Sequence, residues 1–136
     1  MASLAHLNIT AIYAGLTALL LVILSIRVTM ARVKYKVDLG DGGKPEMLRT
    51  IRLQGNLIEY APMALILIAL LELGGSAGWL LHTLGLVFIL ARVLHASVDL
   101  SQKPGLRRGL GATATWIVIL AGGVLVLAMS QGMIVK

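Results

Sequence analysis

One stretch of an otherwise apolar sequence contains a basic, an amide and an acidic residue at regular spacing. Arg52, Asn56 and Glu59 are separated by four and three residues within LRTIRLQGNLIEYAP, so a helix would place them along one face. Ionisable groups within an apolar helix are costly to bury and usually point into a bundle or a wet cavity. The spacing therefore predicts an internal polar face on which Glu59 needs a cationic partner.

A second polar set falls in the segment LARVLHASVD. Arg92, His95 and Asp99 are separated by three and four residues and also share one helical face. We expect Arg92 to be the partner of Glu59. An alternative interpretation is that these charges only neutralise one another and fix the helix register. No His, Asp and Glu residues have a convincing metal-ligand spacing, so we expect no metal site.

The elements that must position these residues are four apolar stretches, each close to the about 20 residues that a helix needs to cross a bilayer core. They cover residues 7–28, 57–73, 78–94 and 110–129. Charged residues make up 13% of the chain, against about a quarter in a soluble domain. The runs are continuously apolar rather than alternating, which argues against strands. The sequence predicts an all-α membrane protein, a single domain over residues 1–136, with four transmembrane helices in an up-down bundle.

The loop charges predict an orientation. Positive charge favours the cytoplasmic face, and the basic residues gather in the first and third connections, whereas the second, ELGGSAG, has none. We therefore expect the first and third loops in the cytoplasm, with both termini and the second loop outside. The first stretch lacks the preceding positive charge of a signal peptide, so we expect a retained helix. The first loop, about residues 31–48, is the one long connection expected.

Composition also excludes several functions. The chain has no cysteine, which excludes disulfides, thiolate metal sites and a cysteine nucleophile. The formal charge of +6 with only 4% aromatic residues indicates membrane orientation and attraction to anionic headgroups rather than nucleic-acid binding. The segment DLGDGGKPE lacks the G-K-[ST] of a phosphate loop. A small multidrug transporter is a weaker match, because the first apolar stretch carries no carboxylate.

The polar motifs resemble those of the MAPEG family, the membrane-associated proteins in eicosanoid and glutathione metabolism. The pattern Arg52-x-x-x-Asn56-x-x-Glu59, followed by Pro62, is similar to the R-x-x-x-N-x-x-E of that family's second helix. Arg92-Val-Leu-His95 resembles the R-x-x-H of the microsomal prostaglandin E synthase branch. Helix number and loop lengths agree over nearly the whole chain, and the short basic first loop with DGG is similar to that of the bacterial members.

The resemblance implies a homotrimer that holds glutathione, as a co-substrate, between neighbouring subunits near the cytoplasmic face. It also implies a hydrophobic second substrate that enters from the lipid. If the protein is bacterial, its location would be the inner (plasma) membrane. Arginine forks suit the carboxylates of glutathione and a glutamate suits its ammonium group. The residues that the resemblance assigns to glutathione are Arg32, Arg52, Gln54, Asn56, Glu59, Tyr60, Arg92 and His95.

Two departures from the family pattern bear on catalysis. Catalytic members carry an arginine in the first turns of the fourth helix, where a cation lowers the pKa of the bound thiol. Here Gly109-Leu-Gly-Ala-Thr-Ala-Thr-Trp116 has none, and Arg107 and Arg108, about one turn earlier, are the candidate substitutes. Asp99 stands where the family has a tyrosine. Two functions follow: a glutathione transferase or peroxidase acting on lipophilic electrophiles, or a non-catalytic lipid-binding or scaffold protein, as in the lipoxygenase-activating branch.

Overall fold

Four helices account for the regular secondary structure that the computed structural model describes, which covers residues 7–97 and 106–133. They are α1 (Asn8–Tyr35), α2 (Pro45–Leu73), α3 (Gly78–Ala96) and α4 (Leu106–Ser130). Each is long and apolar enough to cross a membrane. The predicted all-α fold with four candidate spans is confirmed.

The helices continue beyond the apolar stretches, most of all around the first connection. The expected loop of about residues 31–48 is shorter in the structure, because α1 runs to Tyr35 and α2 already starts at Pro45. Proline suits a first helical turn, where its missing N–H would have no partner. Lys36 ends α1 in the left-handed conformation (φ 54°). Hydropathy marks the residues that suit lipid, whereas helix ends are set by backbone hydrogen bonds, so the two boundaries differ.

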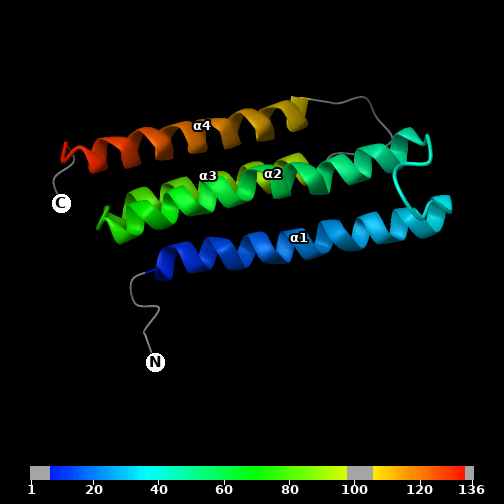
Figure 1. Ribbon diagram of the computed structural model, residues 1–136, viewed down its shortest axis with the longest axis horizontal. Coiled ribbons are helices and arrows are strands. Elements are labelled where there is room, and N and C mark those ends of the chain that lie inside the picture. The colour runs from blue at the N-terminus through cyan, green and yellow to red at the C-terminus, as the bar shows by residue number, and fades with distance from the viewer. Residues whose placement is uncertain (1–6, 98–105, 134–136) are drawn as a thin grey trace.

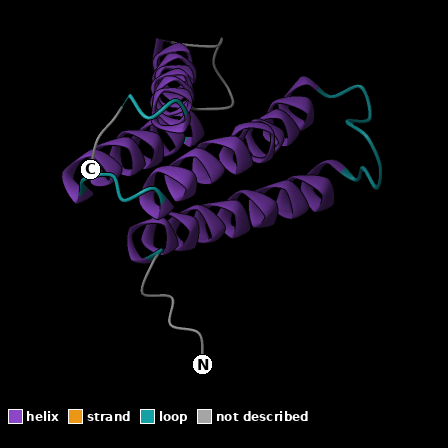
Figure 2. Ribbon diagram, turned by 60° about the vertical axis from the view of Figure 1, so that its left-hand side comes forward, coloured by secondary structure: helices purple, strands orange, loops and turns teal. Residues whose placement is uncertain are grey.

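Hydrogen bonds between helix ends show which parts of the helices lie together. The start of α1 is bound by Glu72 near the end of α2, and Arg92 near the end of α3 is bound to Gly111 near the start of α4. Figure 1 shows α2 and α3 between α1 and α4, in agreement with the helix contacts. Figure 2 shows the described loops at the two ends of the bundle. The basic motifs and the α1–α2 loop therefore share one end, which we call the basic end.

The core combines large apolar side chains with small residues. A cluster of fully or nearly fully buried side chains joins all four helices: Leu24, Leu57, Ile68, Leu71, Leu81, Phe88 and Val118. Much of the outer surface is also apolar; Leu19 and Leu127, for example, are 65% and 67% exposed. An apolar outside around a closely packed inside fits a bundle surrounded by lipid, where small residues let helices approach.

Gly111 permits a close approach between α3 and α4. A Cβ atom at this position would lie 2.6 Å from the carbonyl oxygen of Ala91 and 3.0 Å from the backbone nitrogen of His95. These obstacles are backbone atoms, which cannot move aside as a flexible side chain can. The glycine therefore brings α4 against the segment of α3 that carries Arg92 and His95.

Candidate functional site

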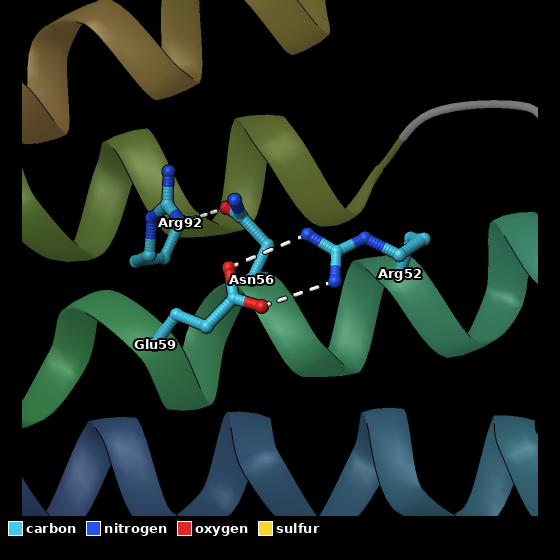
Figure 3. A network of polar contacts seen from close by, with 4 residues as sticks. All are labelled: Arg52, Asn56, Glu59 and Arg92. Atoms are coloured by element: carbon cyan, nitrogen blue, oxygen red, sulfur yellow. Dashed lines mark hydrogen bonds and ion pairs between the residues drawn. The ribbon is translucent and has the colours of Figure 1, made fainter.

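The exposed part of the candidate site is an ion pair on α2. Arg52 donates to Glu59 through both terminal nitrogens, Nη1 to Oε1 at 3.0 Å and Nη2 to Oε2 at 3.4 Å. The two residues are seven positions apart, so their contact confirms that they share one helical face. The two side chains are 49% and 47% exposed in this single chain. Their charged groups are thus aligned but still open to a further partner (Figure 3).

The buried part of the site is centred on Arg92, which is 2% exposed. Its Nη1 donates to Oδ1 of Asn56 on α2 at 2.6 Å, and its Nη2 donates to the carbonyl oxygen of Gly111 on α4 at 3.0 Å. Arg92 therefore ties three helices together. Its Nε is buried and has no hydrogen-bond partner among the residues that the structure describes.

The expected pairing of Arg92 with Glu59 is wrong. Glu59 is bound by Arg52 of its own helix, and the side-chain partner of Arg92 is the amide of Asn56 (Figure 3). Among the described residues, no carboxylate lies within ion-pair distance of Arg92. A pair within one helix needs no particular packing of α2 on α3, whereas Arg92 is directed by that packing toward Asn56 and Gly111.

His95 lies one turn after Arg92 and is also buried, at 3% exposure. Its Nδ1 is 3.3 Å from the carbonyl oxygen of Arg108 at the start of α4. A carbonyl oxygen can only accept, so this contact requires the proton on Nδ1, and in a neutral ring Nε2 is then an acceptor. Nε2 is buried, and no described residue bonds to it. Within residues 7–97 and 106–133, the basic end thus holds two buried nitrogens without a hydrogen bond, on Arg92 and His95, which is uncommon in folded proteins.

Two of the remaining sequence-predicted residues make hydrogen bonds outside this cluster. Gln54 donates through Nε2 to the hydroxyl of Ser25 on α1 at 2.7 Å. Arg32 donates to backbone carbonyls of the first loop, including those of Asp38 and Gly40 at 3.0 and 3.2 Å. In this chain, therefore, Gln54 joins α2 to α1, and Arg32 holds the loop.

Tyr60 and the two arginines of α4 complete the set. Tyr60 is half-buried beside Glu59 in the sequence. Arg107 is exposed, and Arg108 is half-buried with its carbonyl toward His95. The start of α4 therefore approaches the buried part of the site. Asp99, the predicted third member of the α3 set, lies outside the described residues.

Sequence reasoning missed two groups that the structure adds to the cluster. The carbonyl of Gly111 accepts from Arg92 and also from the hydroxyl of Thr115 at 2.9 Å. Ser25 accepts from Gln54. The small residue Gly111, early in the fourth apolar stretch, was the available signal for close packing. A carbonyl acceptor leaves no mark in the sequence, because every residue has one.

A second polar network at the opposite end was also missed, and we call it the capping end. Glu72 of α2 accepts from the backbone N–H groups of Ile9 and Thr10 at 2.8 and 2.7 Å. Leu7, which precedes α1, supplies no side-chain cap. The Tyr13 hydroxyl donates to the carbonyl oxygen of His82 at 3.0 Å and lies 3.1 Å from its Nδ1. The carboxylate thus satisfies the first turn of a different helix, where a negative charge is favoured.

The donor set does not favour a metal ion. The described residues contain no group of three or more His, Cys, Asp or Glu side chains that could hold one. The basic end is rich in guanidinium groups instead, and these recognise carboxylates and other anions.

The fold and the polar cluster together define a class: a four-helix membrane protein that keeps charged and amide side chains at one end of an apolar bundle. The chain belongs to the MAPEG family, whose model matches residues 10–128. The inner membrane protein YecN of Escherichia coli strain K12 is 38% identical over 112 residues, covering 82% of this chain and 85% of the relative. YecN of E. coli O6:H1 matches with the same figures. The resemblance to bacterial members of the family is confirmed.

Proposed function

We propose that this MAPEG family protein binds glutathione at the basic end and uses it as a co-substrate, as a transferase or peroxidase acting on lipophilic electrophiles. The observation that carries the proposal is the half-exposed Arg52–Glu59 pair. The γ-glutamyl end of glutathione carries a carboxylate beside an ammonium group. Arg52 offers a fork to the carboxylate and Glu59 an acceptor to the ammonium, so one protein ion pair is exchanged for two pairs with the ligand.

The other residues support this arrangement from within the bundle. Arg92 fixes Oδ1 of Asn56, which leaves the amide NH₂ of Asn56 to donate to a peptide carbonyl. The free Nε of Arg92 and Nε2 of His95 supply a donor and an acceptor for a ligand that reaches the interior. In this proposal Tyr60 lines the pocket, while Gln54 and Arg32 bind polar groups of the ligand.

Catalysis needs the glutathione thiol in its nucleophilic thiolate form. A nearby cation lowers the pKa of a thiol and so favours the thiolate. We propose Arg107 and Arg108 for this role, because they open α4 next to His95. In the transferase reaction the thiol would lose its proton to solvent, and the thiolate sulfur would use an electron pair to form a bond to an electrophilic carbon of the second substrate. The bond from that carbon to its leaving group would break, and the leaving group would depart with the electron pair of that bond. Arg107→Ala or Arg108→Ala should lower the rate and raise the pH at which the thiolate forms, with binding largely kept.

We further propose a homotrimer in the inner membrane of a bacterium, with an up-down arrangement and both termini outside the cytoplasm. The Arg52–Glu59 pair is half-exposed in a single chain, so a neighbouring subunit can supply further partners for its charges. The E. coli relative is an inner membrane protein by name. Native mass spectrometry in detergent should show three subunits, and a stable monomer that binds glutathione would contradict the shared site.

Single cysteines at Asp41 and Ser76 test the orientation: labelling from outside intact cells should reach Ser76 and not Asp41.

A non-catalytic lipid-binding or scaffold protein is the second candidate. It is favoured by one observation, the absence of arginine from α4 after Arg108. Such a protein would keep the fold and the polar cluster without activating a thiol. It would bind a hydrophobic small molecule or membrane lipid and show no turnover with glutathione and an electrophile.

Calorimetric titration of the purified full-length protein with glutathione in detergent separates these functions. We expect saturable binding below millimolar concentration. Glu59→Gln should weaken the binding of glutathione more than that of an analogue without the α-amino group, because only glutathione loses an ion pair. If Glu59 only neutralises Arg52, the variant will affect both ligands equally. Wild-type protein that fails to bind glutathione at millimolar concentration would favour the scaffold function.

A further inference from the structure

A separate groove opens at the basic end between the last turns of α1 and the start of α2. Its volume is about 320 Å³. The side chains that line it are Arg27, Met30, Ala31, Lys34, Tyr35 and Thr50. The α1 members are spaced by three and four residues or lie next to one another, so they form one face of that helix. None of these residues belongs to the proposed glutathione site.

The groove is cationic. Arg27 is half-buried, and its Nη1 donates to the carbonyl oxygen of Ala96 at 2.9 Å, which fixes the guanidinium at the end of α3. The exposed ammonium of Lys34 lies 5.3 Å from the centre of the Tyr35 ring. Lys44 places a second ammonium 5.7 Å from the same ring. None of the described residues that line the groove is acidic, so the site favours an anion.

The groove also lies where the apolar part of α1 ends. Arg27 is the first charged residue after the apolar run, and Lys34 follows after two helical turns, about 10 Å further along the axis. The headgroup layer on each side of a bilayer is about 5–7 Å deep, so the two cations bracket it, and long side chains reach toward it. Met30, which is 66% exposed, lies between the two cations, and Ile26 and Ile23, 54% and 56% exposed, continue the surface of α1 toward its apolar side.

We propose that this groove binds an anionic phospholipid, with the phosphate between Arg27 and Lys34, beside Met30, and an acyl chain along Ile26 and Ile23. The cations alone would also attract free phosphate. The exposed apolar side chains beside them distinguish a lipid, because only a lipid offers chains to cover them. Basic pockets between helices at the cytoplasmic side are suited to such headgroups. The site would tie the basic end of the bundle to one type of lipid.

Native mass spectrometry of the full-length protein with phosphatidylglycerol or phosphatidylcholine in mixed micelles tests the site. We expect wild-type protein to retain phosphatidylglycerol preferentially. Lys34→Gln should lower that retention about fivefold, the equivalent of about 1 kcal/mol for one basic residue near a membrane surface. Lys36→Gln is the matched control, because Lys36 is exposed, lies two residues away and does not line the groove. This control should retain phosphatidylglycerol as the wild type does.

Arg27 provides a second test. Arg27→Gln removes the bond to Ala96 and could lower stability, so Arg27→Lys, which keeps the charge, is measured beside it and should recover most of the retention. Equal losses in Lys34→Gln and Lys36→Gln would overturn the proposal in favour of diffuse surface charge. Full displacement of the lipid by inorganic phosphate would show a free-anion site. A changed subunit number in Lys34→Gln with unchanged lipid preference would assign the groove to contact with a second copy.

Discussion

The polar side chains at the two ends of this bundle differ in how far their hydrogen bonds are satisfied. At the capping end, Glu72 accepts from two backbone N–H groups of α1, and the Tyr13 hydroxyl is bound to His82. The buried hydroxyl of Thr10 lies near the same carboxylate but makes no hydrogen bond of ordinary geometry with the described residues. At the basic end, a charged pair is half-exposed, and buried nitrogens of Arg92 and His95 have no hydrogen-bond partner in the described part of the chain.

Under the proposed function, this difference separates polar groups that hold the fold from polar groups that are available to a ligand. An unsatisfied buried polar group costs about 1–3 kcal/mol, so a fold gains nothing by leaving cationic and imidazole nitrogens unpaired. A hydroxyl carries no charge, so leaving it unsatisfied costs less than leaving a guanidinium unsatisfied. Substitutions at the two ends should therefore separate stability from binding.

The largest effect is expected from Gly111→Ala, which changes the packing beneath the basic end. The added Cβ would meet the Ala91 carbonyl at 2.6 Å, and the backbone cannot yield. We expect the free energy of unfolding to fall by an amount near the upper end of the range typical of overpacking, about 1–3 kcal/mol. We also expect loss of glutathione binding, because a shift of α4 moves the carbonyl oxygen that accepts from Arg92. Thermal unfolding in detergent and calorimetry measure the two effects.

Gly123→Ala is the matched control for that substitution. Gly123 lies in the same helix, and a methyl group added there would meet no atom within 4 Å. Only helix propensity therefore changes, by up to about 1 kcal/mol in favour of the helix. If Gly111→Ala were as well tolerated as Gly123→Ala, the close contact of α3 with α4 would not position the site.

Arg52→Ala should give the next largest effect, on binding rather than on stability. A charge-assisted hydrogen bond contributes about 1.5–3 kcal/mol, so glutathione should bind about ten- to a hundredfold more weakly. The unfolding temperature should change little, because exposed ion pairs contribute at most about 1 kcal/mol. Arg52→Lys should recover only part of the affinity, since an ammonium lacks the planar fork. A large loss of stability with unchanged affinity would make Arg52 a structural residue.

Glu72→Gln should have the smallest effect, confined to stability. The amide keeps one acceptor oxygen for Ile9 or Thr10 but turns an NH₂ group toward the other N–H, and it removes the favourable charge. We expect the free energy of unfolding, measured by thermal unfolding, to fall by about 1 kcal/mol, as for other helix caps. Glutathione affinity should match that of the wild type. A parallel loss of affinity would show that the two ends are coupled and would remove the distinction between them.

The helices, and the helical face shared by Arg52, Asn56 and Glu59, could be predicted from the sequence, because both depend on local periodicity. The partner of Arg92 could not be predicted from the sequence, because it depends on how α3 packs against α2 and α4. The cap by Glu72 was missed for a related reason: the residue belongs to the end of α2 and acts on the start of α1. The lack of a capping side chain before α1 was the available signal. Contacts between a side chain and a distant backbone group require the fold.

The bonds of Arg92 also bear on the order in which the protein is made. Its two acceptors lie on α2 and α4, so when α3 leaves the ribosome only Asn56 is available. A guanidinium within an apolar helix is costly in lipid until it is satisfied. Arg92 can therefore complete its hydrogen bonds only after α4 has been synthesised and has packed against α3 at Gly111. Chains that stop before α4 would expose an unsatisfied charge within the membrane, a feature by which quality control can distinguish unfinished copies from complete ones.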